Sequence, residues 1–252
     1  MYWAEMPDAD QVAALYATDY TESHGQLAIQ EGNRAYYKTH VIEMRNELGR
    51  RRFSLLDYGS SYPVLAQEAM AKGVSAAAVD FSSDVLAWAR ERNIPAFAPQ
   101  DDLPRCDVLR FSHVLEHLID PRQVLCSLLL KLNPGGIVCI TQPNFPVFKA
   151  RFTGVALKDS VWPTHLHFFS PLSLFRLLDG FGLEIFRFDT HPPHDESDRA
   201  AFAEHIDLAI IEAELAGIKT RTLSSGDCRF PFYIGQNSGC WARHKAHSSA
   251  LA

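Results

Sequence analysis

The sequence predicts a doubly wound α/β domain, in which a mostly parallel sheet carries helices on both faces. Short apolar segments alternate with helical segments from Phe53 onward, and this rhythm is typical of βαβ units. The chain has 252 residues, of which 47% are hydrophobic, so it can bury one full core. We therefore expect a single domain, with residues 1–52 as a helical cover and residues 53–252 as the main body with a C-terminal extension.

The elements of the main body follow in a regular order. Strands are expected at 53–57, 75–80, 106–112, 137–141 and 183–189, with a short extended piece near 96–98. Helices are expected at 62–72, 83–92, 120–131, 171–179 and 199–216. Asp120 and Pro121 are typical of a helix start, and the Asn-Pro-Gly-Gly segment at 133–136 is typical of a helix end. Residues 228–244 predict one or two antiparallel strands.

The N-terminal cover is expected to contain helices near 9–17 and 33–48 and to lie over the ligand edge of the sheet. Its aromatic and polar side chains could close over a bound molecule, although each one singly is more often a packed surface residue. These side chains are Tyr16, Tyr20, His24, Tyr36 and Tyr37.

Charge and cysteine content narrow the class of partner. The formal net charge is −6 and no Lys/Arg-rich run is present, which argues against nucleic acid or an anionic membrane as the main partner. The five cysteines are scattered without CxxC spacing, so they predict neither a disulfide framework nor a thiolate metal site. The N-terminus lacks signal-peptide features, and the longest apolar run, 124–132, is too short to span a bilayer. We expect a cytoplasmic protein with a small-molecule partner, and leave a homodimer open.

Residues 55–81 carry the first candidate site. They form a strand, a turn at Gly59, a helical run and a second strand that ends at Asp80. Glycine permits a sharp turn that a ligand can approach closely, and a carboxylate at the tip of the next strand can accept both hydroxyls of a ribose. The alternative is an ordinary βαβ crossover with an incidental glycine and aspartate.

Four blocks in order resemble class I S-adenosylmethionine-dependent methyltransferases, specifically the small-molecule group that includes the ubiquinone-biosynthesis O-methyltransferases. The blocks are LLDYGS with VDFS, CDVLRFSHVLEHLIDP, LNPGGIVCITQPN, and THLHFFSPLSLFRLL with GFGLEI. The resemblance runs from about Tyr16 to Glu184. It implies a seven-stranded Rossmann-like sheet, S-adenosylmethionine as cofactor with S-adenosylhomocysteine as product, and methyl transfer to oxygen or nitrogen of a small-molecule acceptor.

The resemblance also implies which residues bind the cofactor. Asp57, Gly59, Ser60 and Ser61 are expected by its methionine part, Asp80 at the ribose, and Phe81 against adenine. The stretch Asp101, Asp102 and Leu103 is expected to face the adenine amino group, and the choice between the two aspartates is open. Ser112 and His113 are expected near the sulfonium, and Tyr20 is expected to close over the cofactor from the cover.

The chain departs from the family at the first turn. Where the family commonly has GxGxG, this chain has Gly59-Ser60-Ser61-Tyr62-Pro63. Serine is small and proline is tolerated at a helix start, so cofactor binding remains the expectation. GxGxxG is absent, which argues against a dinucleotide. The altered turn keeps open a second function: a non-catalytic cofactor-binding or interaction protein on the same fold.

A histidine cluster is the candidate for chemistry. His113, Glu116 and His117 share one face if the helix has begun by His113, and His165 and His167 follow the fifth strand. Three interpretations stay open: ordinary structural residues, a general base, or a metal site. Some relatives carry ExxEH plus a further histidine as metal ligands. Here His113 replaces the first acid, and HxxEH suits a transition metal better than Mg²⁺. We name His113, His117 and His165 as catalytic candidates and predict no metal site.

The long loop at 143–169 is expected to form the acceptor wall. Trp162 is its best pocket candidate, and Asn144 could orient the acceptor. Phe145, Phe148 and Phe168 could add apolar surface, whereas Phe169 is expected in the core.

Overall fold

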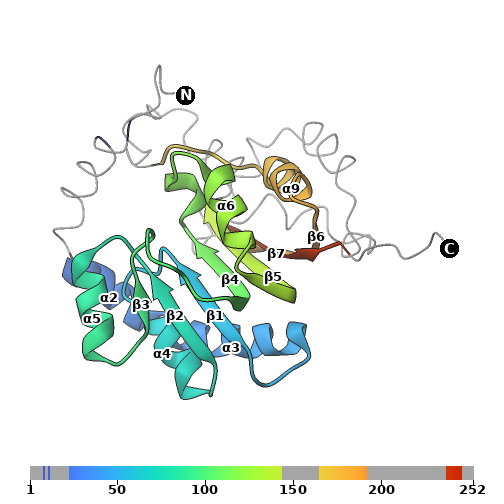
Figure 1. Ribbon diagram of the computed structural model, residues 1–252. Helices are drawn as coiled ribbons and strands as arrows, with labels where there is room; N and C mark the ends of the chain where they lie inside the picture. Colours follow the sequence, from blue (N-terminus) through green and yellow to red (C-terminus); the bar gives the residue numbers. More distant parts are fainter. Residues whose placement is uncertain (1–7, 9–10, 12–22, 144–164, 192–236, 246–252) are drawn as a thin grey trace, which may run out of the picture.

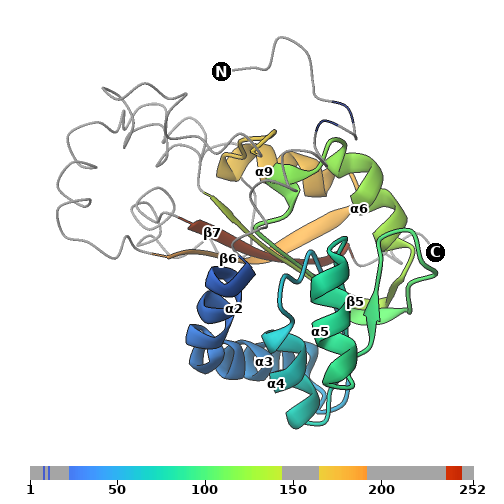
Figure 2. The ribbon, with the colours of Figure 1, turned by 90° about the vertical axis from the view of Figure 1, so that its left-hand side faces the viewer.

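The computed structural model of the chain describes residues 8, 11, 23–143, 165–191 and 237–245. A seven-stranded sheet lies between two layers of helices (Figures 1 and 2). The strands are β1 (Ser54–Tyr58), β2 (Ser75–Val79), β3 (Ala96–Phe97), β4 (Cys106–Ser112), β5 (Leu132–Pro143), β6 (Leu183–His191) and β7 (Asn237–His244). The helices are α2 (Ser23–Gly32), α3 (Arg34–Leu48), α4 (Val64–Ala71), α5 (Ser83–Glu91), the 3₁₀ turn η2 (Leu115–His117), α6 (Pro121–Leu129) and α9 (Pro171–Asp179).

The strand order β3-β2-β1-β4-β5-β7-β6 confirms the doubly wound prediction. Strands β1 to β5 pair in parallel, and β7 is inserted antiparallel between β5 and β6. The chain runs outward from β1 through β2 to β3 and then returns to β4 on the other side of β1. Ligands of such sheets bind where the strand order reverses, beyond the carboxyl ends of the strands. That point lies here between β1 and β4.

Side chains along each strand point alternately to the two faces of the sheet, and this divides the core into two layers. Leu55, Val108 and Cys139 face α3 and α4, whereas the next residues, Leu56 and Leu109, face α6 and α9. Because successive side chains point to opposite faces, strands that are apolar on both faces require helices on both sides. This explains the nearly continuous apolar character of the sequence in these strands.

The N-terminal helices lie on a face of the sheet, so the prediction that they cover its ligand edge is wrong for α3. The buried side chains of α3 are Tyr37, His40, Val41 and Met44, and three of them join the core with α4 and β1. The apolar stripe of α3 therefore faces strands rather than a ligand. The predicted helix at 9–17, with Tyr16 and Tyr20, falls outside the described residues, and the side chain of His24 is also not described.

Local signals place several element ends correctly. Asp120 Oδ1 accepts a hydrogen bond from the Gln123 backbone N–H at 2.9 Å, as expected of an N-cap. The segment at 133–136 belongs to β5, which starts at Leu132, so the prediction of a strand only from 137 is too short. The predicted helix at 199–216 and most of the long loop, including Asn144, Phe145, Phe148 and Trp162, fall outside the described residues.

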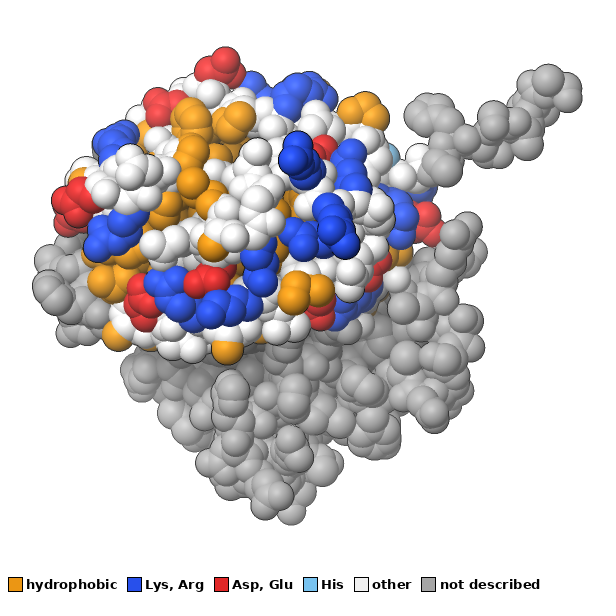
Figure 3. Space-filling model, turned by 90° about the horizontal axis from the view of Figure 1, so that it is seen from below, with side chains coloured by type: hydrophobic (Ala, Val, Ile, Leu, Met, Phe, Trp, Pro, Cys, Tyr) orange, Lys and Arg blue, Asp and Glu red, His pale blue; other side chains and the backbone are white. Residues whose placement is uncertain are grey.

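The surface seen from below Figure 1 mixes side chains of both charges (Figure 3). Ion pairs such as Arg50–Asp107 and Lys131–Asp102 match basic with acidic groups on the exterior. Cys106, Cys139 and Cys240 are buried free thiols, whereas Cys126 is exposed. Within the described ranges, every helix is too short or too polar to cross a membrane.

Candidate active site

The turn after β1 is tied to the end of β2. The backbone N–H groups of Gly59 and Ser60 both donate to the Val79 carbonyl, at 2.8 and 3.1 Å. Gly59 has φ +69°, and a Cβ added there would lie 2.4 Å from Val114 Cγ2. Glycine is therefore required for its positive φ and for contact with Val114. The space beside Gly59 is filled by protein, not kept open for a ligand as the sequence suggested.

Asp80 holds the rest of this turn in place. Its Oδ2 accepts from the Ser61 backbone N–H at 2.9 Å, and its Oδ1 accepts from Ser82 at 3.0 Å. Ser61 has φ +48°, a left-handed conformation that costs a non-glycine residue about 1 kcal/mol or more. Burial raises the pKa of Asp80, and the backbone N–H groups of Ser82, Ser61 and Phe81 oppose that shift. The adjacent Phe81 exposes 55% of its surface.

The structure separates the two aspartates that the sequence left open. Asp101 accepts from the Ala98 backbone N–H at 2.8 Å, just after β3 ends at the ligand edge. Asp102 has a side chain that is 95% exposed and pairs with Lys131 at 2.7 Å, next to the amino end of β5. Asp102 is therefore held beside the amino end of β5, whereas Asp101 lies nearer the ligand edge. Leu103 is buried in the core.

Asp57 is paired inside the sheet. Its Oδ1 accepts from Arg110 Nη1 at 2.7 Å, and the two residues are opposite one another in the β1–β4 register. Burial acts to lower the pKa of Arg110, but Asp57, Tyr37 and Tyr36 together outweigh it and the net shift is upward. Sequence reasoning missed Arg110, although a lone charge within the apolar run 108–111 signals a buried carboxylate partner. One oxygen of Asp57 is thus committed to protein rather than to the cofactor.

His113 follows Ser112, the last residue of β4, in a strained conformation. It has φ +54°, and its N–H donates to the Thr141 carbonyl at 2.8 Å. The 3₁₀ turn η2 begins only at Leu115, so the condition that the helix has begun by His113 is not met. The left-handed backbone of His113 turns the chain here, and His113 does not share a helix face with Glu116 and His117. Strained residues concentrate at functional sites.

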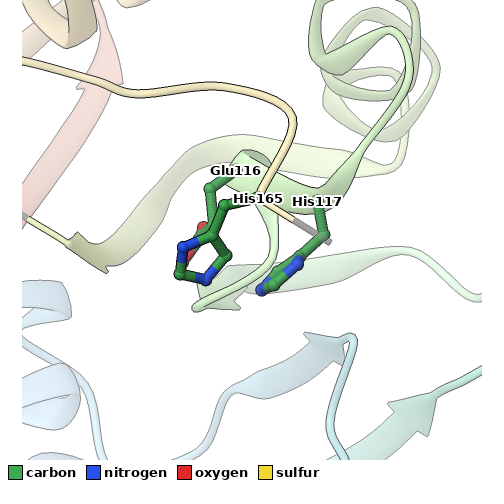
Figure 4. Close-up of side chains that lie close together, drawn as sticks. All are labelled: Glu116, His117 and His165. Carbon is green, nitrogen blue, oxygen red and sulfur yellow. The ribbon is translucent and has the colours of Figure 1, made fainter. Parts of the chain in front are cut away.

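Three side chains from two distant segments converge beside this turn (Figure 4). We call Glu116, His117 and His165 the Glu116 cluster; one potential ligand atom from each lies within 4.8 Å of the others. The rings of His117 and His165 are 4.7 Å apart between centroids. His113 is also close, with Nδ1 3.4 Å from Glu116 Oε1. All three predicted catalytic histidines therefore lie at one site.

The cluster combines a buried acid with uncharged imidazole. Glu116 is only 2% exposed, and among the described residues neither of its carboxylate oxygens has a hydrogen-bond partner. Burial lowers the pKa of His165 to about 4, with His117 as the second cause, so this imidazole is neutral at pH 7. Neutral imidazole can accept a proton or bind a metal. His167 lies apart, with Nε2 3.3 Å from the Ile119 carbonyl.

A comparison with protein families identifies the chain. The profile of a family described as a methyltransferase domain matches residues 29–187, which is more than half of the sequence. The chain belongs to this methyltransferase family. The methyltransferase uses S-adenosylmethionine and releases S-adenosylhomocysteine. A comparison with curated proteins found no match.

Solved structures share the fold of this methyltransferase. A possible histamine N-methyltransferase from Thermotoga maritima has a TM-score of 0.60 and 14% identity, covering 93% of this chain and 100% of that chain. The plantazolicin methyltransferase BpumL, in complex with S-adenosylhomocysteine, has a TM-score of 0.51 and 13% identity, covering 95% and 91%. The [4+2]-cyclase SpnF has a TM-score of 0.52 and 16% identity, covering 83% and 82%. At such identities the likeness establishes the fold alone.

A second buried polar residue of the methyltransferase also escaped sequence reasoning. Gln142 lies near the carboxyl end of β5 and is fully buried, and neither atom of its amide has a hydrogen-bond partner in the structure as described. Its signal is an amide side chain two residues after the apolar run 137–140. Together with Glu116, it places unmatched polar groups at the edge where ligands of this fold bind.

Proposed function

We propose that the methyltransferase transfers a methyl group from S-adenosylmethionine to an oxygen or nitrogen of a small-molecule acceptor. The observation that supports this most is the contact between Gly59 and Val114. It joins the turn that precedes Asp80 to the turn that carries His113 and the Glu116 cluster. Cofactor-binding and proton-accepting groups thereby meet at one sheet edge, where reactants must be aligned.

The residues present suit S-adenosylmethionine. The cofactor has no phosphate, so it needs no phosphate cradle, and a glycine-poor turn is compatible with it. We assign Asp80 to the ribose hydroxyls, Phe81 to one face of adenine and Asp101 to the adenine amino group. Asp80 can still accept hydroxyl donors, because each carboxylate oxygen has about two acceptor sites. Ser61 Oγ is buried and finds no hydrogen-bond partner in the part of the chain that the structure describes, and it can turn toward the methionine part.

The chemical step needs alignment and, for a protonated acceptor, a base. The sulfonium is already a good leaving group, so the protein mainly holds the acceptor atom in line with the methyl carbon. His113 has a side chain that is 43% exposed at the ligand edge and is the most accessible candidate base. His117 and His165 are the alternatives for this role. A general base contributes about 10²- to 10⁴-fold in rate.

A second candidate function is a non-catalytic cofactor-binding protein. The altered turn favours it, with left-handed Ser61 in place of a glycine, and the [4+2]-cyclase SpnF is an example of other chemistry on this fold. Calorimetry of the full chain with S-adenosylmethionine and S-adenosylhomocysteine tests cofactor binding first. We expect binding in the micromolar range; no binding at millimolar cofactor would overturn the proposal.

A methyl-transfer assay separates the two functions. The enzyme is incubated with methyl-labelled S-adenosylmethionine and panels of hydroxyl and amine acceptors, and transfer of label to one class supports catalysis. With an acceptor in hand, His113→Ala, His117→Ala and His165→Ala are compared with His167→Ala, which lies outside the cluster. If the first three variants all keep full turnover, the base assignment is wrong.

A further inference from the structure

The Glu116 cluster is fixed by backbone hydrogen bonds between two segments. The Glu116 carbonyl accepts from the N–H groups of Leu166 and His167, at 2.7 and 3.0 Å. These bonds hold η2 against the segment that leads into α9. His165 is thereby brought to the side chains of Glu116 and His117 from a distant part of the sequence (Figure 4). The arrangement belongs to the fold and does not depend on flexible side chains alone.

The carboxylate of Glu116 lacks the partners that a buried charge requires. Within the described ranges, its one ion pair is with His113 at 3.4 Å, and both of its oxygens remain without a hydrogen bond. A buried carboxylate without compensation costs several kcal/mol. The fold therefore keeps two strong acceptor atoms at a position where a cation would satisfy them.

The three donors are close enough to share one ion. Potential ligand atoms of Glu116, His117 and His165 lie within 4.8 Å of one another. Ligand atoms around a metal with bonds of about 2.1 Å are separated by about 3 to 4 Å. Small rotations of the side chains suffice to close this difference. The planes of the two imidazoles are tilted by 59°, so the rings are not stacked flat against each other.

The donor set decides which metal fits. Mg²⁺ takes oxygen ligands in a strict octahedron, and one carboxylate with two imidazoles serves it poorly. Imidazole nitrogen suits Zn²⁺, Fe²⁺, Co²⁺ and Ni²⁺, and two histidines with one carboxylate leave further coordination positions open. We propose that Glu116, His117 and His165 form a binding site for a divalent transition metal. His113 lies outside this set and contacts the carboxylate from the exposed side.

The chemical use of this metal rests on the proposed function. An acceptor oxygen could bind the divalent ion at an open coordination position. The ion would withdraw electron density from this oxygen, so the proton on the oxygen would be easier to remove. His113 is then the one imidazole of the site that can take up this proton. Metal binding itself requires neither cofactor nor acceptor, so it can be tested alone.

The test uses the full chain after removal of metal with a chelator. Zn²⁺ is titrated by calorimetry, Co²⁺ is followed by its visible absorption, and thermal unfolding is recorded with each metal and with chelator. We compare wild type with Glu116→Gln and His165→Ala, and with His167→Gln as matched control. We expect one equivalent of metal per chain, at least about tenfold weaker binding in the first two variants, and wild-type binding in the control.

Thermal unfolding shows whether a variant loses metal binding because it is misfolded. With chelator, Glu116→Gln should be at least as stable as wild type, because it removes an unmatched buried charge. With Zn²⁺, wild type and His167→Gln should gain stability, while Glu116→Gln should not. Equal gains in wild type and Glu116→Gln, or no gain in either, would overturn the site. Metal binding without methyl transfer would count against the proposed function alone, and methyl transfer by a chain that binds no metal would count against the site alone.

Discussion

Arg110 donates a hydrogen bond from Nη1 to Asp57 Oδ1 across 2.7 Å, and both side chains are almost completely buried. The two residues are direct neighbours on β1 and β4, beside the point where the strand order reverses. The Arg110 guanidinium also lies 5.8 Å from the centre of the Tyr37 ring on α3. The pair therefore links two central strands and the helix that covers them.

Breaking this pair should destabilise the fold strongly. We expect Arg110→Met to lower the free energy of unfolding by about 3–5 kcal/mol, because it leaves Asp57 charged and buried. Asp57→Leu should cost a similar amount, while the double variant should recover much of the loss. Urea unfolding of the four proteins measures this. Additive losses in the double variant would show that the two charges do not depend on each other.

Gly59→Ala should be much more harmful than a glycine substitution elsewhere. The new methyl meets Val114 Cγ2 at 2.4 Å, in addition to the strain of a positive φ. Gly73→Ala is the matched control, because Gly73 has φ +77° and no atom within 4 Å of the added Cβ. We expect about 1 kcal/mol for the control and about 1–3 kcal/mol more for Gly59→Ala. Val114→Ala should restore part of this difference; equal losses at the two glycines would contradict the steric account.

Asp80→Ala should weaken cofactor binding by about 10- to 100-fold. The substitution removes the proposed ribose acceptor and also frees the Ser61 and Ser82 backbone N–H groups, at about 1–3 kcal/mol in total. Asp102→Ala is the control, because its exposed carboxylate pairs with Lys131 at the opposite edge and should leave affinity unchanged. Calorimetry with S-adenosylhomocysteine gives both affinities. Wild-type affinity in Asp80→Ala would refute the ribose assignment.

Stability should fall as pH drops below about 6.5, in part because of His40. Burial lowers the pKa of His40 below its ordinary value of 6.5, although the Glu43 carboxylate opposes the shift. The folded state then keeps His40 neutral while the unfolded chain takes up a proton, so stability is full above pH 6.5 and declines below it. One such group gives a slope of up to about 1.4 kcal/mol per pH unit.

His40→Gln isolates this contribution. Urea unfolding of wild type and variant is compared between pH 5 and pH 8. This range lies well above the pKa of Glu43 in the wild type, which the His40 hydrogen bond lowers to about 2. We expect a smaller loss of stability toward acid in the variant. Parallel curves for the two proteins would show that His40 is not held neutral by the fold.

Sequence reasoning succeeded where the determinant is local. The cap formed by Asp120 and Pro121, and the strand, turn and strand of residues 55–81, are each specified by neighbouring residues, and the structure contains them. Strand β5 begins earlier than predicted because pairing with β4 extends from Leu132 onward, and this pairing depends on a segment distant in sequence. The antiparallel position of β7 likewise depends on its neighbours β5 and β6.

In the site, too, the features set by neighbouring residues were predicted and those set by distant residues were not. The resemblance and the spacing of histidines located His113, His117 and His165 together, but no local pattern shows that Glu116 is buried without hydrogen bonds. The register that places Arg110 opposite Asp57 is likewise a property of paired strands. Asp101 and Asp102 are adjacent in sequence, and only the descent of the chain from β3 to β4 sends them to opposite edges.

The close packing of Val114 against Gly59 connects cofactor binding with metal binding. Val114 immediately precedes η2, which carries Glu116 and His117. A displacement of the turn at Gly59 would therefore move Val114 and, with it, these two proposed metal ligands. Two ligands that act on one shared contact are thermodynamically coupled, and each must change the affinity of the other by the same factor. Binding of the cofactor should then change the affinity for the metal, and binding of the metal should change the affinity for the cofactor.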